Sequence, residues 1–514
     1  MSQPGGVEGL PQAVHNSSRL HRTSFGALAL TGASVLRLLL QFSLLPILAR
    51  LVGPAEYGLV ALAMPFILLA NVLADGGLGY ALGRQAQASR ELESTVFWLT
   101  AAFGAALALA CCLAALPMGA ILHQPRLPWL IMALSPILLM NGLTAVSNGR
   151  IIREGRFAVF AVGDVISTGL GAATALTAAM SGWGAWSLVA QQLVLWGSKL
   201  VWVTFNGRAQ IGFHCKPQEA RGLLAFGVST IGAILADFVA RNLDSLIVGG
   251  VLGVTALGHY AMAYQIVRVP DMLISGPLYL YIFTAVSRTA GDVSGKAAQG
   301  LAIAGLRLGS VVLAPLFCGL ALVADLAVGL VLGPKWAGAV EALQYLSIAG
   351  FFFCMCSILS TTAMGLGRSR LQLSMSVLLA VTCVLVVAAS VRFGLGAVSA
   401  SLAAGMASVF AVYVVRMARE LRMAAARFLT AMAPAAAATG LMACVALATR
   451  AALGHGAPLL VFGVTIATAA ISYCAVLVFF RGRLARDASA FAKAQADPPH
   501  DPAPVVAAPV AGSA

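Results

Sequence analysis

Long apolar segments recur along almost the whole of this chain, and they limit its fold more than any other feature. Fourteen of them lie between residues 25 and 480, each about as long as the 20 apolar residues that a transmembrane helix needs. Of the 514 residues, 60% are hydrophobic and 10% are charged, against about 25% charged in an ordinary soluble domain. The sequence therefore predicts an all-α integral membrane protein of about 14 transmembrane helices. It excludes a soluble globular protein and a barrel of alternating strands, and its short loops leave no room for a soluble catalytic domain.

The two ends of the chain differ from this apolar core. Residues 1–24 are polar, contain glycine and proline, and have no apolar segment of the kind that a cleaved signal peptide carries. Residues 481–514 begin with three arginines and continue into an Ala/Pro-rich stretch that cannot bury a core. Both ends are expected to be disordered tails.

The basic residues indicate how the helices are oriented. When the loops are assigned to alternate sides of the membrane, one side collects 22 of the 32 lysines and arginines and the other side collects five. An excess of Lys and Arg in cytoplasmic loops is the positive-inside pattern. It predicts that both tails are cytoplasmic, and it explains the net charge of +14 without a nucleic-acid partner.

The two halves of the chain share a local pattern. LVGPAEYGLVALAMPF matches VLGVTALGHYAMAYQI at an offset of 200 residues, which aligns Gly53 with Gly253. Chance similarity between glycine-rich loops is the alternative explanation. Parallel repeats are common in transporters, so the match predicts two pseudo-symmetric lobes of six helices. The expected parts are an N-lobe over 25–206, a cytoplasmic inter-lobe loop over 207–221, a C-lobe over 222–417 and two accessory helices over 428–480.

Polar residues inside the apolar segments are the main functional signal, because a charge at the centre of a spanning helix costs about 2.5–3.5 kcal/mol. The first segment places Thr31, Ser34, Arg37 and Gln41 on one face of a helix. These neighbours of Arg37 are neutral, so its counter-charge must be either an acidic residue across a cleft or an anionic ligand. Lys199 also lacks a local partner, and Arg307 is expected to extend to the cytoplasmic interface.

The first two helices of the second lobe carry both charges and aromatic residues. Asp237, Arg241 and Asp244 share one face of the seventh helix, where they can neutralise one another as a purely structural ion-pair cluster. The eighth helix carries a row of two tyrosines, an arginine and an aspartate, namely Tyr260, Tyr264, Arg268 and Asp271. An Arg–Tyr face suits a phosphorylated sugar, because guanidinium groups bind phosphate oxygens through paired hydrogen bonds.

Metal binding and redox chemistry are not indicated by the cysteines. Eight of the nine cysteines lie in apolar segments, where they are expected to pack as small hydrophobic residues, and the chain has no Cys-x-x-Cys motif. We therefore expect no metal, no cofactor and no catalytic residues.

Three motifs resemble those of a known family. They are LVGPAEYGLVALA, VLADGGLGYAL, and VLGPKWAGAVEAL over residues 331–343. Together with the surrounding helices they resemble the bacterial polysaccharide flippases of the Wzx or exopolysaccharide-exporter type. These flippases share a superfamily with drug/cation antiporters (the MATE-like fold) and with lipid II flippases.

The resemblance implies both a fold and an activity. The fold is a MATE-like V shape of two six-helix lobes with two C-terminal accessory helices. The activity is alternating-access transport of an undecaprenyl-pyrophosphate-linked oligosaccharide from the cytoplasmic to the periplasmic leaflet of the bacterial inner membrane, for O-antigen or exopolysaccharide biosynthesis. The implied partners are the lipid-linked oligosaccharide and membrane lipid, with a polysaccharide polymerase and glycosyltransferases as further candidates.

Charge position alone supplies the hypothesis for the site. The expected substrate-binding residues are Arg37, Gln41, Arg241, Tyr264 and Arg268, and the expected residues for coupling to a cation or proton are Asp237, Asp244 and Asp271. Two other functions stay open. A drug/cation antiporter of the same superfamily typically has 12 spans and acidic cleft residues, and a membrane glycan polymerase or ligase usually carries its catalytic residues on a long outer loop.

Overall fold

The computed structural model is helical throughout its described residues, and these divide into two compact units. It describes residues 32, 36–37, 39–75, 89–207, 212, 242–272, 276–289, 295–454 and 456–496. Unit 1 covers Met1–Asn242 and unit 2 covers Leu243–Ala514. In the part of the chain that the structure describes, 11 helices are long and apolar enough to cross a membrane. The predicted all-α membrane fold is confirmed, whereas the count of 14 and the V shape stay predictions.

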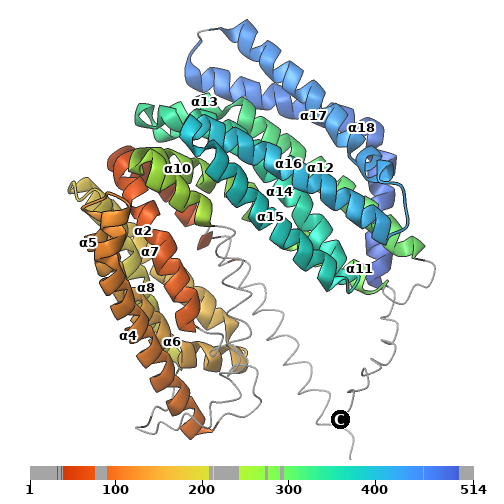
Figure 1. The fold of residues 1–514 in the computed structure, drawn as a ribbon. Coiled ribbons are helices and arrows are strands. Elements are labelled where there is room, and N and C mark those ends of the chain that lie inside the picture. Colours follow the sequence, from red (N-terminus) through yellow and green to blue (C-terminus); the bar gives the residue numbers. More distant parts are fainter. Residues whose placement is uncertain are drawn as a thin grey trace, which may run out of the picture. The chain divides into compact units, whose positions relative to one another are not determined.

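Unit 1 begins with a short apolar helix, Leu39–Val52, and continues with long helices that lie side by side (Figure 1). They are α2 (Pro54–Asp75), α4 (Arg90–Ile121), α5 (Leu127–Leu134), α6 (Pro136–Arg153), α7 (Phe157–Met180) and α8 (Ala185–Gly207). Small residues let these helices approach closely. At the crossing of α4 and α6, a Cβ on Gly142 would clash with the Thr100 carbonyl oxygen. The Thr100 hydroxyl instead donates to the Gly142 carbonyl oxygen at 2.8 Å.

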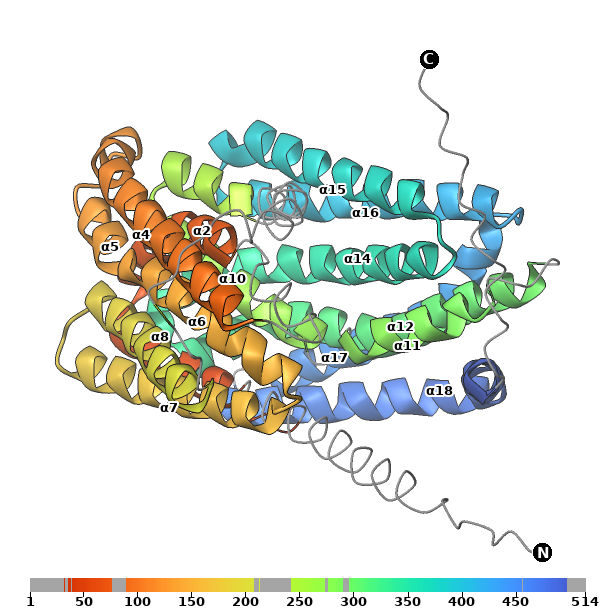
Figure 2. The ribbon, with the colours of Figure 1, turned by 90° about the horizontal axis from the view of Figure 1, so that it is seen from below.

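Unit 2 is a second bundle, in which neighbouring helices follow the order α15, α16, α14, α12, α17 (Figure 2). Its first described helix is the short apolar helix Asn242–Leu252, of which all but Asn242 belongs to unit 2. Its labelled helices are α10 (Val254–Pro270), α11 (Gly276–Ser287), α12 (Lys296–Leu322), α13 (Ala324–Ala327), α14 (Val340–Gly365), α15 (Ser369–Ser390), α16 (Leu395–Glu420), α17 (Ala426–Leu453) and α18 (Pro458–Ala496). Short 3-10 and π turns join some of them. The LGPKW motif forms one of these turns and buries Trp336 completely.

The predicted internal repeat has a structural counterpart at its glycines. Gly53 and Gly253 adopt φ values of 76° and 86°, and each is followed at once by a helix. This conformation is sterically unfavourable for residues with a Cβ. The next turn repeats as well, because the Gly53 and Gly253 carbonyl oxygens accept from backbone N–H groups four residues on, both at 3.1 Å. The two units therefore use the same helix–glycine–helix junction at matching positions.

A second pair of matching segments begins α8 and α16. The sequences GWGAWS over 182–187 and GLGAVS over 394–399 occupy the starts of these two helices. A glutamate packs against the second glycine in both units: Glu56 lies against Gly184, and Glu341 lies against Gly396. The sequence match supports the repeat, whereas the two glutamates come from helices that the repeat does not pair, α2 and α14.

The accessory helices pack on α12. The Tyr473 hydroxyl donates to the Val311 carbonyl oxygen at 2.6 Å, and Arg307 pairs with Asp487 at 2.7 Å. Arg307 thus pairs with an aspartate of α18 rather than only extending to an interface. The prediction that the C-terminal tail is disordered from residue 481 is wrong for residues 481–496, because α18 continues to Ala496. The arginines of this segment favoured a solvated tail, but the segment is alanine-rich and forms a helix whose Asp487 pairs with Arg307 of α12.

Contacts between loops support the alternation of sides within each unit. At one end of unit 1, Arg153 of the α6 terminus pairs with Glu93 of the α4 start. At the other end, Arg126 pairs with Glu56. In unit 2, Gln299 at the start of α12 donates to the Leu421 carbonyl oxygen after α16 at 2.7 Å. In each case the alternation of sides along the chain puts the two contacting helix ends on the same side, whereas the assignment of the cytoplasmic face itself stays a prediction.

Candidate functional site

Three charged residues of unit 1 meet between its helices. The Asp164 carboxylate of α7 accepts a hydrogen bond from Arg37 at 3.2 Å and pairs with the Lys199 ammonium of α8 at 2.8 Å. We refer to Arg37, Asp164 and Lys199 as the charged triad. Arg37 and Asp164 are 127 residues apart in the sequence, so only the packing of the helices brings them together.

Close packing of α7 on α8 positions two members of the triad. Gly163 lies directly against the Trp202 ring, where any larger residue would clash. The Trp202 indole N–H donates to the Val159 carbonyl oxygen at 3.0 Å. The Lys199 ammonium lies 5.0 Å from the centre of the Phe160 ring, within cation–π range. These contacts fix the side of α8 that faces α7, and they hold Lys199 beside the Asp164 carboxylate.

Two members of the triad lie well inside their membrane-spanning helices. Asp164 is the eighth residue of α7 and Lys199 is the ninth from the end of α8, so both lie about 11–12 Å from the helix ends on that side. The opposite ends of the same helices are about 21–24 Å away. Since the hydrocarbon core of a bilayer is about 30 Å thick, these positions place Asp164 and Lys199 within the part of each helix that crosses it.

The triad carries a net positive charge, and its side chains are not sealed. One carboxylate faces two cations, and the side chains of Arg37, Asp164 and Lys199 are 39%, 19% and 18% exposed. Guanidinium and ammonium groups have five and three N–H donors, and Asp164 uses few of them. The remaining donors can bind an anionic group. Gln41, one helical turn after Arg37, is also exposed and adds a neutral polar side chain on the same face.

The structure corrects the expectation for the counter-charge of Arg37. Its acidic partner is a residue of the same unit, and Lys199, expected to lack a local partner, shares that carboxylate. The sequence analysis missed Asp164. A signal was present, because a single acid in the otherwise apolar segment FAVFAVGDVISTG is costly in a membrane and therefore worth noting.

Asp244 of unit 2 is buried in a hydrogen-bonded position. Its carboxylate accepts from the Tyr260 hydroxyl at 2.7 Å and from the Ser245 backbone N–H at 2.7 Å. Tyr260 is fully buried and stacks on Tyr264 with ring centres 6.1 Å apart. The predicted partners of Asp244, Arg241 and Asp237, lie outside the described residues. Tyr260 faces Asp244 rather than the surface that carries Arg268.

The other two predicted residues of unit 2 are separate from each other. Arg268 is exposed on α10 and forms no ion pair with another described residue. Asp271 instead accepts from the Tyr279 hydroxyl at 3.4 Å and contacts the Cys354 thiol at 3.5 Å. Among the described residues, the two charges therefore do not form a local ion pair.

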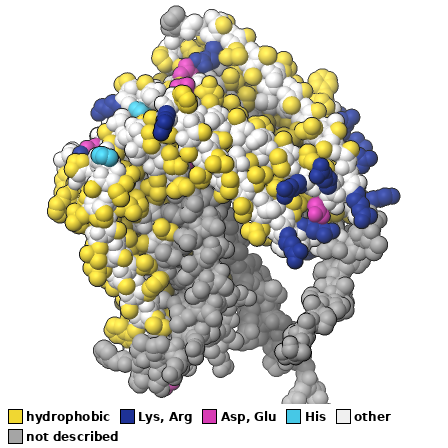
Figure 3. Space-filling model, viewed as in Figure 1, with side chains coloured by type: hydrophobic (Ala, Val, Ile, Leu, Met, Phe, Trp, Pro, Cys, Tyr) yellow, Lys and Arg dark blue, Asp and Glu magenta, His cyan; other side chains and the backbone are white. Residues whose placement is uncertain are grey.

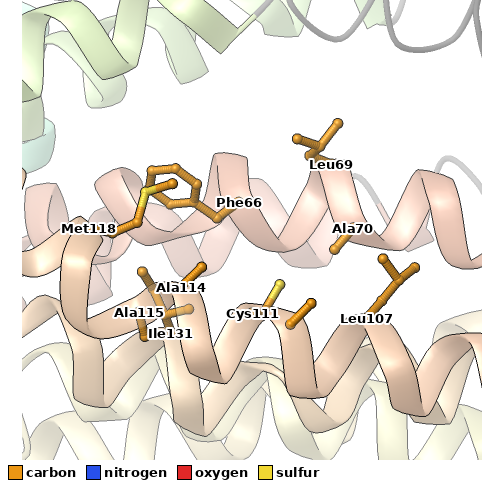
Figure 4. Close-up of a pocket in the computed structure, with 10 residues that line it drawn as sticks. Phe66, Leu69, Ala70, Leu107, Cys111, Ala114, Ala115, Met118 and Ile131 are labelled. Carbon is orange, nitrogen blue, oxygen red and sulfur yellow. The ribbon is translucent and has the colours of Figure 1, made fainter.

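An apolar pocket of about 210 Å³ lies between α2 and α4 of unit 1. Phe66, Leu69 and Ala70 of α2 face Leu107, Cys111 and neighbouring residues of α4 across it (Figure 4). Its side chains offer carbon and sulfur, so it can hold hydrocarbon but not a charged headgroup. No group of three metal-ligating side chains occurs among the residues that the structure describes.

Sequence comparison places the chain in a family. The profile of the family described as polysaccharide biosynthesis protein matches residues 47–341, which is more than half of the chain. The chain belongs to this family. The predicted resemblance to the bacterial polysaccharide exporters is therefore confirmed.

Curated relatives have related names. The succinoglycan biosynthesis transport protein ExoT of Rhizobium meliloti (strain 1021) is 27% identical over 329 residues, which is 64% of this chain and 66% of the relative. The lipopolysaccharide biosynthesis protein WzxC of Escherichia coli (strain K12) is 23% identical over 311 residues, covering 59% and 62%. The teichuronic acid biosynthesis protein TuaB of Bacillus subtilis (strain 168) is 23% identical over 306 residues, covering 59% and 63%. The chain thus matches slightly less than two thirds of the length of each.

Solved structures share the fold. The lipid II flippase MurJ in an inward closed conformation superposes with a TM-score of 0.70 at 11% identity, over 90% of this chain and 99% of that chain. An inward-facing multidrug resistance MATE family transporter of the MOP superfamily superposes with a TM-score of 0.60 at 14% identity, over 76% and 98%. At these identities the likeness shows the fold alone, which is that of membrane transporters.

Proposed function

We propose that this protein is a flippase that moves an undecaprenyl-pyrophosphate-linked oligosaccharide from the cytoplasmic to the periplasmic leaflet. The observation that carries the proposal is the charged triad, a net positive, partly exposed group of side chains at membrane depth. A pyrophosphate cannot cross hydrocarbon unaided, because the burial of unpaired charge is prohibitive. The triad provides the pyrophosphate with counter-charge and hydrogen-bond donors while it crosses the membrane.

Family membership supports the class of substrate. Relatives named for succinoglycan, lipopolysaccharide and teichuronic acid biosynthesis handle different glycans. Such substrates can share a lipid carrier with its phosphates. A phosphate-binding site can therefore serve substrates whose glycans differ. Transport by alternating access in the bacterial inner membrane, with both termini cytoplasmic, completes the proposal.

The remaining site residues take the following roles in the proposal. Arg37, with Lys199 and Gln41, binds the pyrophosphate in unit 1, and Arg241, Tyr264 and Arg268 of the predicted C-lobe are the further proposed substrate-binding residues. Asp244 and Asp271, together with Asp237, exchange a cation or proton for substrate. A polysaccharide polymerase and glycosyltransferases are its proposed partners in the pathway.

Complementation of a strain that lacks the gene tests the proposal. We expect Arg37→Ala and Lys199→Ala each to lower polymer export about tenfold or more, since a hydrogen bond to a charged group contributes about 1.5–3 kcal/mol. Lipid-linked oligosaccharide should accumulate in the cytoplasmic leaflet. Arg392→Ala is the matched control, because Arg392 is an exposed arginine on a turn after α15 in unit 2 and is not a member of the triad. Normal export by both triad variants, at normal protein levels in the membrane, would refute the proposal.

A further inference from the structure

Five arginines surround one hollow at the end of two helices of unit 2. The hollow has a volume of about 620 Å³ and is lined by Arg368 and Arg370 at the start of α15 and by Arg416, Arg419 and Arg422 at the end of α16. Glu420 is its one acidic lining residue and lies 3.5 Å from Arg368. Figure 3 shows these dark blue side chains gathered on one face around a single magenta one. We call this hollow the arginine basin, and it carries four more positive than negative charges.

The basin lies at headgroup depth. The helices that bound it begin at Ser369 and end at Glu420, so its arginines stand where α15 and α16 leave the apolar layer. Basic residues at this end of the spans belong to the side that the positive-inside pattern assigns to the cytoplasm. Anionic lipids of the cytoplasmic leaflet attract such residues.

An exposed apolar stripe runs along α15 away from the basin. Leu373, Val377, Val381 and Leu385 follow one another at intervals of four residues, which places them on one face of the helix. Their exposed fractions are 49–67%. The surface thus combines a cationic basin with an adjoining apolar stripe, which matches an amphiphile with an anionic head and acyl chains better than a free anion.

One arginine of the basin occupies a backbone position that glycine would favour. Arg422 ends α16 with a φ of 50°, in a turn closed by the Met423 N–H donating to the Ala418 carbonyl oxygen at 2.9 Å. The equivalent turns after α6, α7 and α14 place Gly155, Gly182 and Gly367 there, with φ values of 67°, 78° and 72°. A left-handed conformation is sterically unfavourable for a residue with a Cβ. Arg422 thus places a charged side chain at the basin where these three turns have no side chain.

We propose that the arginine basin binds the headgroup of a membrane phospholipid that carries two phosphates, with its acyl chains along the α15 stripe. Guanidinium groups bind phosphate oxygens in pairs, and five of them around one hollow exceed what a single phosphate needs. The site is separate from the charged triad, and the proposal does not depend on the transported substrate.

Arg422→Gly is the decisive variant, because it removes one charge and also relieves the unfavourable backbone conformation. The purified protein is reconstituted in phosphatidylcholine nanodiscs, and cardiolipin is titrated in. We expect the variant to bind cardiolipin about fivefold more weakly, since each arginine near an anionic surface contributes about that factor. Its thermal unfolding midpoint without cardiolipin should equal or exceed that of the unchanged protein. Arg392→Ala, which removes an exposed arginine from the opposite end of α15, should bind cardiolipin normally.

Three results would overturn the proposal. Unchanged cardiolipin affinity of Arg422→Gly would show that the basin does not bind the headgroup. Equal binding of phosphatidylglycerol at matched total charge would show attraction to any anionic surface rather than a site for two phosphates. Displacement of cardiolipin by a small amount of undecaprenyl pyrophosphate would assign the basin to the transported lipid.

Discussion

Removal of the Asp164 carboxylate should affect its two cationic partners unequally. Asp164→Asn keeps the size of the side chain and leaves Lys199 and Arg37 without a counter-charge. The bond to Lys199 is the shorter one, 2.8 Å against 3.2 Å, and the Lys199 side chain is half as exposed, 18% against 39%. A charge-assisted hydrogen bond contributes about 1.5–3 kcal/mol when shielded from water, and exposed pairs contribute about 0.2–1 kcal/mol.

These magnitudes predict the outcome of two double-mutant cycles. We expect a coupling energy of about 2 kcal/mol between Asp164→Asn and Lys199→Met, as for a shielded pair. We expect less than about 1 kcal/mol between Asp164→Asn and Arg37→Met, because water screens the more exposed guanidinium. The assay is equilibrium unfolding of the reconstituted protein, by denaturant or by steric trapping.

The same variants separate binding from stability. Asp164→Asn raises the net charge of the triad from +1 to +2, so we expect weaker folding but tighter binding of a lipid pyrophosphate. Equal coupling energies in the two cycles would refute the inferred geometry. If Asp164→Asn lost both stability and pyrophosphate binding, the view that the cations, rather than the carboxylate, bind the anion would be refuted.

Three further predictions concern other contacts. Gly184→Ala should lower the thermal unfolding midpoint, because its Cβ would lie 2.8 Å from a Glu56 carboxylate oxygen at a φ of 55°, whereas Gly440→Ala, with open space around it, should not. Partial burial raises the pKa of Glu154, but hydrogen bonds from two neighbouring arginines lower it more, so the pKa is below its ordinary 4.5. The stability that Glu154 contributes is therefore present above pH 4.5 and lost as the pH falls through the lowered pKa, and Glu154→Gln should remove this part of the pH dependence of unfolding. Tyr473→Phe should cost about 1 kcal/mol by removing a buried hydrogen bond between α18 and α12, and should speed proteolysis of α18.

Comparison of the two halves of the sequence predicted part of the repeat but not its side-chain contacts. The Gly53–Gly253 match predicted equivalent junctions, and both glycines adopt the left-handed conformation before a helix. The match between GWGAWS and GLGAVS could have been found by the same comparison of the two halves. It was missed because it lies at a different offset. Its meaning depends on two glutamates that pack against the glycines from distant helices, and spacing alone does not show these contacts.

The prediction of a disordered C-terminal tail was wrong for residues 481–496, because it considered the segment without its neighbouring helix. Residues 481–496 begin with three arginines, which favoured a solvated tail, although six of the 16 residues are alanine, a strong helix former. The ion pair of Asp487 with Arg307 of α12 gives this segment a partner, and the helix continues. Composition predicts disorder correctly only where no such partner is within reach.

The helical, membrane-spanning character of this protein and the alternation of its loops follow from the sequence alone. A bilayer requires each span to satisfy its own backbone hydrogen bonds over about 20 apolar residues, and both conditions are local. The pairing of charges was decided by tertiary structure. Arg37, Asp164 and Lys199 come from three helices, and only the close packing permitted by residues such as Gly163 brings them within hydrogen-bond distance. Which helices lie side by side is a property of the folded bundle, and the chemistry of the triad depends on it.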